Sequence, residues 1–299
     1  MIWTIGSAVL SGLLLEVTSY PKPGLVAPHS MGSHKDMDLQ SFMLSSAAIA
    51  PCLYACARVG LMHDGAAFTI LPIIRDLGRE FDRRLLRSTH GVNTQRGALF
   101  CAGVISAAAG RSHKTGGGMT AKDVLKQSAK IVEGICEREL INANPIEAKT
   151  AGEILYRDHG TTGIRGEVEA GFPTVLNFGL PALIEALDAG CDLNHALVYS
   201  LIELIAKADD TTVLWRGGKK AQDFIRNEAA RICASGNVLT SEGLRQIAAL
   251  NDACIARNIS PGGAADLLSV TAAVYLLEHQ VFPQESMIQN HQGSAHSRS

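Results

Sequence analysis

The chain has few aromatic residues and no marked excess of either charge. Aromatic residues make up 5% of its 299 residues, and the formal net charge is −2. Proteins that cover a nucleic-acid backbone usually carry a clear excess of Lys and Arg. We therefore expect no nucleic-acid partner. The hydrophobic fraction of 46% and the charged fraction of 19% are typical of a soluble globular protein whose core consists mainly of aliphatic side chains.

Paired cysteine motifs are also missing. The chain has seven cysteines, an odd number, and none of them forms a Cys-x-x-Cys pair. Cys52 and Cys56 are one helical turn apart, where an apolar helix face uses cysteine as a small buried residue. This usage favours reduced cytosolic thiols without a bound metal.

No targeting segment or membrane span is expected. The segment Ile5 to Leu15 is apolar, but no Lys or Arg precedes Lys22, so the positive start of a signal peptide is missing. The apolar run is also too short to cross a bilayer. We interpret it as a buried first helix, and we expect a cytoplasmic protein without a membrane partner.

Helical periodicity dominates the chain, and no run alternates as a strand would. The sequence predicts an all-α fold with a single multi-helix domain over residues 1–283 and a disordered polar tail over 284–299. Pro21 should follow the end of the first helix, and Asp38 and Thr120 should cap two later helices. The predicted helical segments are 2–18, 39–63, 94–110, 121–141, 148–158, 174–189, 193–208, 217–234, 240–256 and 262–280.

Polar residues gather at the joints between these helices. Glycine there lets backbone N–H groups approach an anion, and helix N-termini add a favourable dipole. Closely spaced acidic residues recur in the same segments and are costly if buried unpaired. These features fit a Mg²⁺–nucleotide site formed by polar loops at helix ends, although ordinary surface caps fit the spacing equally well. The segments are 21–26, 34–38, 91–97, 163–173, 209–218 and 260–266.

Taken in order, these segments resemble the triphosphoribosyl-dephospho-coenzyme A synthase family, which serves the carrier proteins of citrate lyase and malonate decarboxylase. The resemblance runs from about Leu13 to Leu277. Three positions depart from the family pattern: Gln95 stands where His is common, Thr212 where Asn is usual, and Ile164 where a small residue is usual. The matching segments are 16–17, 21–26, 34–37, 91–94, 150–156, 165–173, 210–218 and 258–268.

The resemblance implies a transferase that substitutes the anomeric carbon of the ATP ribose. The 2′-hydroxyl of 3′-dephospho-CoA attacks, adenine leaves, and the triphosphate stays on the sugar. The product would be the precursor of an acyl carrier protein's prosthetic group. Mg²⁺ would accompany ATP as a cofactor. The carrier system served, a contact with the carrier-protein assembly machinery and a homodimer are left open.

Residue chemistry suggests a role for each polar position of this site. Asn93 would orient the ribose or the base, and His34, Glu153 and Glu169 are the candidate acids, bases or stabilisers of a cationic sugar. The candidate metal ligands are Asp36, Glu167, Asp209 and Asp210. The candidate phosphate-binding residues are Lys22, Lys35, Arg96, Arg165, Arg216, Gly217 and Gly218.

One substitution follows from this assignment. If Asp210 is a partly exposed site residue, Asp210→Asn should abolish turnover and change stability by no more than about 1 kcal/mol.

Two other functions fit the same residues. A Mg²⁺-dependent nucleotide or ADP-ribose glycohydrolase would use the acidic cluster but deliver water to the sugar. A catalytically silent nucleotide-binding accessory protein would bind ATP without releasing adenine. Adenine release with and without 3′-dephospho-CoA distinguishes these functions from the transferase.

Overall fold

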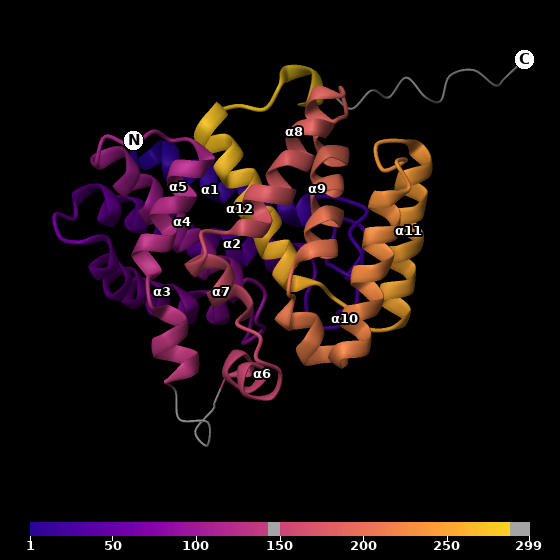
Figure 1. The fold of residues 1–299 in the computed structure, drawn as a ribbon, viewed down its shortest axis with the longest axis horizontal. Helices are drawn as coiled ribbons and strands as arrows, with labels where there is room; N and C mark the ends of the chain where they lie inside the picture. The colour runs from indigo at the N-terminus through magenta and orange to yellow at the C-terminus, as the bar shows by residue number, and fades with distance from the viewer. Residues whose placement is uncertain (143–149, 288–299) are drawn as a thin grey trace, which may run out of the picture.

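The computed structural model describes residues 1–142 and 150–287, and these residues form twelve α-helices without a β-strand (Figure 1). The predicted all-α fold is confirmed. The helices are α1 (Ile2–Thr18), α2 (Leu39–Met62), α3 (Ile70–Ser88), α4 (Arg96–Lys114), α5 (Ala121–Val132), α6 (Ala151–His159), α7 (Gly163–Glu169), α8 (Leu180–Asp188), α9 (Leu193–Lys207), α10 (Thr211–Ala234), α11 (Ser241–Ala256) and α12 (Gly262–His279).

The centre of the fold is made by α12, which packs against α1, α4, α9 and α10. In Figure 1, α12 crosses between a group containing α3, α4 and α5 and a group containing α9, α10 and α11. Nearly every residue of α12 from Ala264 to Leu277 is buried. A helix that is apolar on all sides belongs in the interior of a protein, so the sequence of α12 explains its central place.

Small residues let α2 and α4 pack closely. A Cβ added at Gly60 would collide with the carbonyl oxygen of Ala107, and one added at Gly110 would collide with that of Ala57. The Ala- and Gly-rich composition of this region therefore serves close helix packing. Helix α2 is also long and apolar enough to cross a membrane by length and composition alone. Core helices of soluble proteins pass the same test, and α2 packs against α1, α3 and α4.

Both predicted helix caps are confirmed. The Asp38 carboxylate accepts from the Ser41 N–H at 2.9 Å, and the Thr120 hydroxyl accepts from the Asp123 N–H at 3.2 Å. Helix α1 ends at Thr18, just before Pro21, because proline cannot continue a helix.

Several boundaries were predicted wrongly. The helix expected up to residue 141 ends at Val132, because Gly134 adopts a φ of 75°, and a short π-helix, η2 (Glu137–Ile141), follows. Helix α10 begins six residues earlier than predicted, at Thr211, and is kinked where Gly218 has a φ of 69°. Helices α3 and α7 were not predicted. Of the predicted tail, residues 284–287 form a 3-10 turn, and 288–299 lie outside the described residues, as do 148 and 149.

Candidate active site

A cavity of about 270 Å³ lies where the N-termini of several helices meet. It is lined by the first residues of α4, α10 and α12, and also by the start of the shorter α7. Each helix N-terminus carries unpaired N–H groups and the positive end of the helix dipole. Their convergence favours an anionic ligand such as a phosphate chain. The lining residues at these N-termini are Arg96, Gly97, Ala98, Gly163, Ile164, Thr211, Thr212, Gly262 and Gly263.

Asp210 joins two of these helices. One of its carboxylate oxygens accepts from the N–H groups of Thr212 at 2.9 Å and Val213 at 3.1 Å, and the other accepts from Ala264 N–H at 2.9 Å. Asp210 therefore caps α10 and holds the start of α12 against it. Its side chain is only 6% exposed, so the expectation of a partly exposed residue is wrong. Burial raises the pKa of Asp210, and the four backbone N–H groups that face it act in the opposite direction.

Asp266 also lines the cavity from α12, although no role was predicted for it. Burial raises the pKa of Asp266 well above the ordinary value, and repulsion from Glu16 and Asp210 adds to this effect. Asp266 stands in the polar segment 260–266 and in the matching segment 258–268. Neither segment reveals its surroundings, because the acidic groups that face it come from distant parts of the chain.

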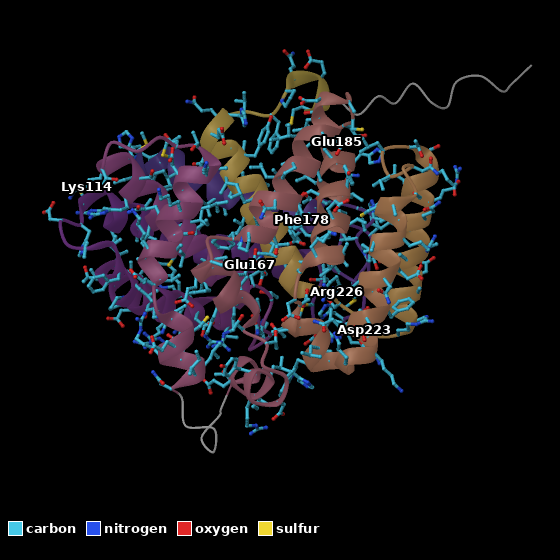
Figure 2. The ribbon with its side chains drawn as sticks, viewed as in Figure 1. Lys114, Glu167, Phe178, Glu185, Asp223 and Arg226 are labelled. Atoms are coloured by element: carbon cyan, nitrogen blue, oxygen red, sulfur yellow. The ribbon has the colours of Figure 1, made fainter. Side chains whose placement is uncertain are left out.

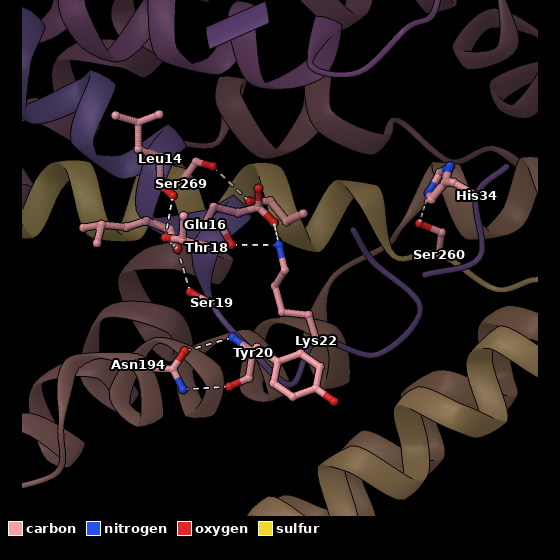
Figure 3. A network of polar contacts seen from close by, with 12 residues as sticks. Leu14, Glu16, Thr18, Ser19, Tyr20, Lys22, His34, Asn194, Ser260 and Ser269 are labelled. Atoms are coloured by element: carbon pink, nitrogen blue, oxygen red, sulfur yellow. Dashed lines mark hydrogen bonds and ion pairs between the residues drawn. The ribbon is translucent and has the colours of Figure 1, made fainter. Parts of the chain in front are cut away.

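Glu16 lines the same cavity and is paired with Lys22. The Lys22 Nζ lies 2.5 Å from Glu16 Oε1 and also donates to the Glu16 carbonyl oxygen at 2.7 Å (Figure 3). Lys22 is 1% exposed and does not itself line the cavity. Burial raises the pKa of Glu16 and lowers that of Lys22, while their attraction opposes both shifts. Lys22 thus compensates a carboxylate at the cavity wall, and its proposed contact with phosphate is not tested.

His34 lies at the cavity wall beside Ser260 and Arg216. The His34 Nε2 is 2.8 Å from Ser260 Oγ (Figure 3), and Arg216 Nη1 is 3.2 Å from His34 Nδ1. Burial lowers the pKa of His34, the charge of Arg216 lowers it further, and Asp36 opposes the shift. These effects favour a neutral imidazole near pH 7 that can accept a proton. Arg216 itself does not line the cavity, and donates to Ser33 O at 2.8 Å and Asn258 Oδ1 at 2.9 Å.

Glu167, on α7, and Asp209, just before α10, both line the cavity. Glu167, near the middle of the view in Figure 2, accepts from the N–H of Thr174 at 2.8 Å and from its hydroxyl at 2.9 Å. Burial raises the pKa of Glu167, and the bonds from Thr174 act in the opposite direction. Asp209 accepts from the Gln222 amide at 2.9 Å and from the Thr161 hydroxyl.

The structure thus brings together six of the residues assigned from sequence and separates the others. The six that line the cavity are His34, Asn93, Arg96, Glu167, Asp209 and Asp210. Lys35, Asp36 and Gly217 are exposed and, like Gly218, do not line it. Glu169 accepts from the N–H of Cys136 at 3.3 Å. Glu153 and Arg165 line a second cavity, which Arg96 also borders. The individual chemical roles stay predictions.

The acidic lining fits a metal ion only in combination with a ligand. Within residues 1–142 and 150–287, no three His, Cys, Asp or Glu side chains are arranged to hold a metal by themselves. Mg²⁺ prefers oxygen ligands and often binds through one or two carboxylates together with substrate phosphates and water. Five carboxylates line the cavity: Glu16, Glu167, Asp209, Asp210 and Asp266. This donor set fits Mg²⁺ shared with a phosphate chain.

Comparison with known proteins places nearly the whole chain in one family. The profile described as ATP:dephospho-CoA triphosphoribosyl transferase matches residues 2–283. A probable 2-(5″-triphosphoribosyl)-3′-dephosphocoenzyme-A synthase of Malonomonas rubra is 39% identical over 283 residues, which cover 94% of this chain and 89% of the relative. The 2-(5″-triphosphoribosyl)-3′-dephosphocoenzyme-A synthase of Klebsiella pneumoniae is 40% identical over 268 residues, covering 89% and 88%.

No solved structure matches the chain. The match of the profile to nearly the whole chain and the identity to these relatives agree with the ordered motifs of the sequence. The chain belongs to the ATP:dephospho-CoA triphosphoribosyl transferase family.

Proposed function

We propose that this chain transfers the triphosphoribosyl group of ATP to the 2′-hydroxyl of 3′-dephospho-CoA and releases adenine. The observation that carries this proposal is one cavity in which helix N-termini and buried carboxylates meet. The N-termini suit a phosphate chain, and the carboxylates suit the positive charge that develops on a sugar during substitution at its anomeric carbon. The names of the relatives from Malonomonas rubra and Klebsiella pneumoniae describe this product.

In this reaction the glycosidic bond between C1′ and the adenine nitrogen breaks. A bond forms between C1′ and the acceptor's 2′-oxygen. The acceptor hydroxyl loses a proton, and the departing adenine gains one. His34 suits the first task, because burial and Arg216 lower its pKa and favour the neutral imidazole. Asp266 suits the second, because burial raises the pKa of its carboxyl well above the ordinary value and favours the protonated form.

The triphosphate would rest against the first turns of α4, α10 and α12, with Arg96 as a charged partner. Mg²⁺, when bound, would offset the negative charge shared by the phosphates and the carboxylates. Asp209, Asp210 and Glu167 are the residues that would hold it. Asn93, whose Oδ1 accepts from the Arg96 N–H at 3.3 Å, would direct its amide N–H groups to the ribose.

The test is adenine release by the purified protein, measured by chromatography with ATP and Mg²⁺ in the presence and absence of 3′-dephospho-CoA. Release that requires the acceptor supports the transferase. Release without the acceptor would indicate a glycohydrolase, and tight ATP binding without any adenine would indicate a silent binding protein.

A further inference from the structure

A second cavity, of about 700 Å³, lies beside the first one. Its walls come mainly from the facing sides of α3 and α4, with further residues from η2, α6 and α7. Arg96, at the start of α4, borders both cavities. The two spaces therefore adjoin at the residue that the proposed function places next to the triphosphate.

The first cavity is too small for both substrates of the proposed reaction. Its 270 Å³ lie below the range of roughly 300–1,000 Å³ in which drug-sized ligands are usually enclosed. The donor and the acceptor are each a nucleotide, and the acceptor also carries a long diphosphate and pantetheine arm. A two-substrate reaction at this place needs additional enclosed space, and the adjoining cavity has it.

The charges of the second cavity differ from those of the first. It is lined by four arginines and three carboxylates, whereas five carboxylates and a single arginine line the first. Two of its arginines share one acid: Arg165 Nε lies 2.9 Å from Glu139, and Arg75 contacts the other Glu139 oxygen. Burial opposes ionisation of Glu139, but hydrogen bonds from both arginines outweigh it and hold its pKa below the ordinary value. The two arginines carry two positive charges against the single negative charge of Glu139, and arginine side chains suit a phosphate without a metal ion.

The rest of the wall is apolar and includes two unusual glycines. A Cβ added at Gly78 would meet nothing within 4 Å, and one at Gly103 would meet only the Cys56 Sγ, at 3.6 Å. Both lie inside helices, and neither has a positive φ. Glycine within a helix costs about 0.5–1 kcal/mol relative to alanine, so neither backbone geometry nor packing accounts for these two residues. The apolar lining residues include Leu71, Ile74, Leu99, Phe100 and Val104.

The other glycines of the first four helices are all explained by packing. An added Cβ would collide with the Tyr54 ring at Gly6, with the Ser269 carbonyl at Gly12, with the Asp266 carboxylate at Gly97, and with backbone carbonyls at Gly60 and Gly110. Gly78 and Gly103 are the exceptions, and both border the same cavity. Their shared effect is to keep this space open between α3 and α4.

We propose that the second cavity binds the diphosphate and pantetheine arm of the acceptor, with the arginines on the diphosphate and the space beside Gly78 and Gly103 taken by the pantetheine. This assignment rests on the proposed function. The acceptor's ribose then lies near Arg96, where the two cavities adjoin, and its 2′-hydroxyl faces the donor sugar. The acidic first cavity holds the triphosphoribosyl part of the donor.

Filling the cavity tests this proposal. Gly78→Met adds a side chain into open space on a helix, and methionine is a better helix former than glycine, so the variant should fold and melt no lower than the wild type. We expect its affinity for 3′-dephospho-CoA, measured by titration calorimetry, to fall at least about tenfold, the loss of one substantial contact. Its affinity for ATP should stay within about twofold of the wild-type value.

Arg75→Ala tests the diphosphate contact. We expect about tenfold weaker binding of 3′-dephospho-CoA, because a charge-assisted hydrogen bond is lost, and unchanged binding of ATP. Arg83→Ala is the matched control, since Arg83 lies on the same helix, is 68% exposed, pairs with Glu80 and does not line the cavity. It should bind both nucleotides as the wild type does.

Wild-type affinity for 3′-dephospho-CoA in Gly78→Met would overturn the assignment, and so would weakened binding of ATP alone. These titrations need no turnover, so they are separate from the adenine assay. A wild type that binds 3′-dephospho-CoA in this cavity but releases no adenine would contradict the proposed function and leave the binding site supported.

Discussion

Asp210 accepts a hydrogen bond from the backbone N–H of Ala264 at 2.9 Å, although the two residues are 54 positions apart. The same carboxylate caps α10 through Thr212 and Val213. One buried side chain thus fixes the angle between two helices whose N-termini line the candidate active site. The structural and chemical roles of this residue are coupled.

Replacing Asp210 by asparagine should therefore reduce both stability and turnover. The amide would place an N–H group against at least one backbone donor, and a buried group left without its partner costs about 1–3 kcal/mol. We expect a lower Tm by thermal denaturation and loss of adenine release. Asp192→Asn is the control, because Asp192 caps α9 through His195 at 2.8 Å and does not line the cavity. If Asp210→Asn and Asp192→Asn lose adenine release equally, the loss reflects reduced stability and not a role of Asp210 in the reaction.

Asp266→Asn should change how stability depends on pH. Burial, then Glu16 and Asp210, raise the folded-state pKa of Asp266. The contribution of Asp266 to the free energy of unfolding is fully present below the pKa of an unfolded aspartate, about 3.9. It is lost as the pH rises to the pKa that Asp266 has in the folded state. Asparagine cannot ionise, so the Tm of the variant minus that of the wild type should be larger at pH 8 than at pH 5. The control is Asp223→Asn, at an exposed residue, which should show no such trend. A Tm difference between Asp266→Asn and the wild type that stays the same at both pH values would refute this effect.

The ion pair of Lys22 and Glu16 should matter more for folding than either charge alone. Lys22→Met leaves the Glu16 carboxylate buried without its partner, which typically costs about 3–5 kcal/mol. We expect this loss in the free energy of unfolding from urea titration. The double variant Glu16→Gln with Lys22→Met should recover most of it, because no unpaired charge remains buried. If the single variant is as stable as the wild type, the pair does not stabilise the fold.

Arg216 should set the pH at which His34 works. Burial and then the positive charge of Arg216 lower the pKa of His34, so Arg216→Gln should raise it. If neutral His34 accepts the proton of the acceptor hydroxyl, activity falls as the pH drops through this pKa. The acidic limb of the adenine-release profile should then move to higher pH in the variant. A uniform loss of activity without a shift of that limb would speak against this role.

The sequence predicted the helices whose ends carry distinct signals. Asp38 and Thr120 are caps because their side chains reach the third N–H of a helix, which is local chemistry. Helix α5 was predicted too long because a single turn at Gly134 gives a weak local signal. Helix α3 was missed although its amphipathic pattern, with Ile70, Ile74 and Leu85 buried on one face, is itself a helix signal.

The motifs contain more of the cavity residues than the sequence could assign to it. Asn93 and Asp210 were assigned to the site from their motifs. Glu16 and Asp266 stand in the matching segments 16–17 and 258–268 but were given no role, because their place in the cavity depends on contacts between α1, α4 and α12. Lys22 shows the reverse case. It was assigned to phosphate from its place in a polar segment, yet folding buries it against Glu16.

The most direct test of the transfer reaction is mass spectrometry of the acceptor after incubation with ATP, Mg²⁺ and the purified protein. We predict that 3′-dephospho-CoA gains the mass of one triphosphoribosyl group for each adenine released. Unmodified 3′-dephospho-CoA beside free adenine and ribose triphosphate would contradict the proposed transfer.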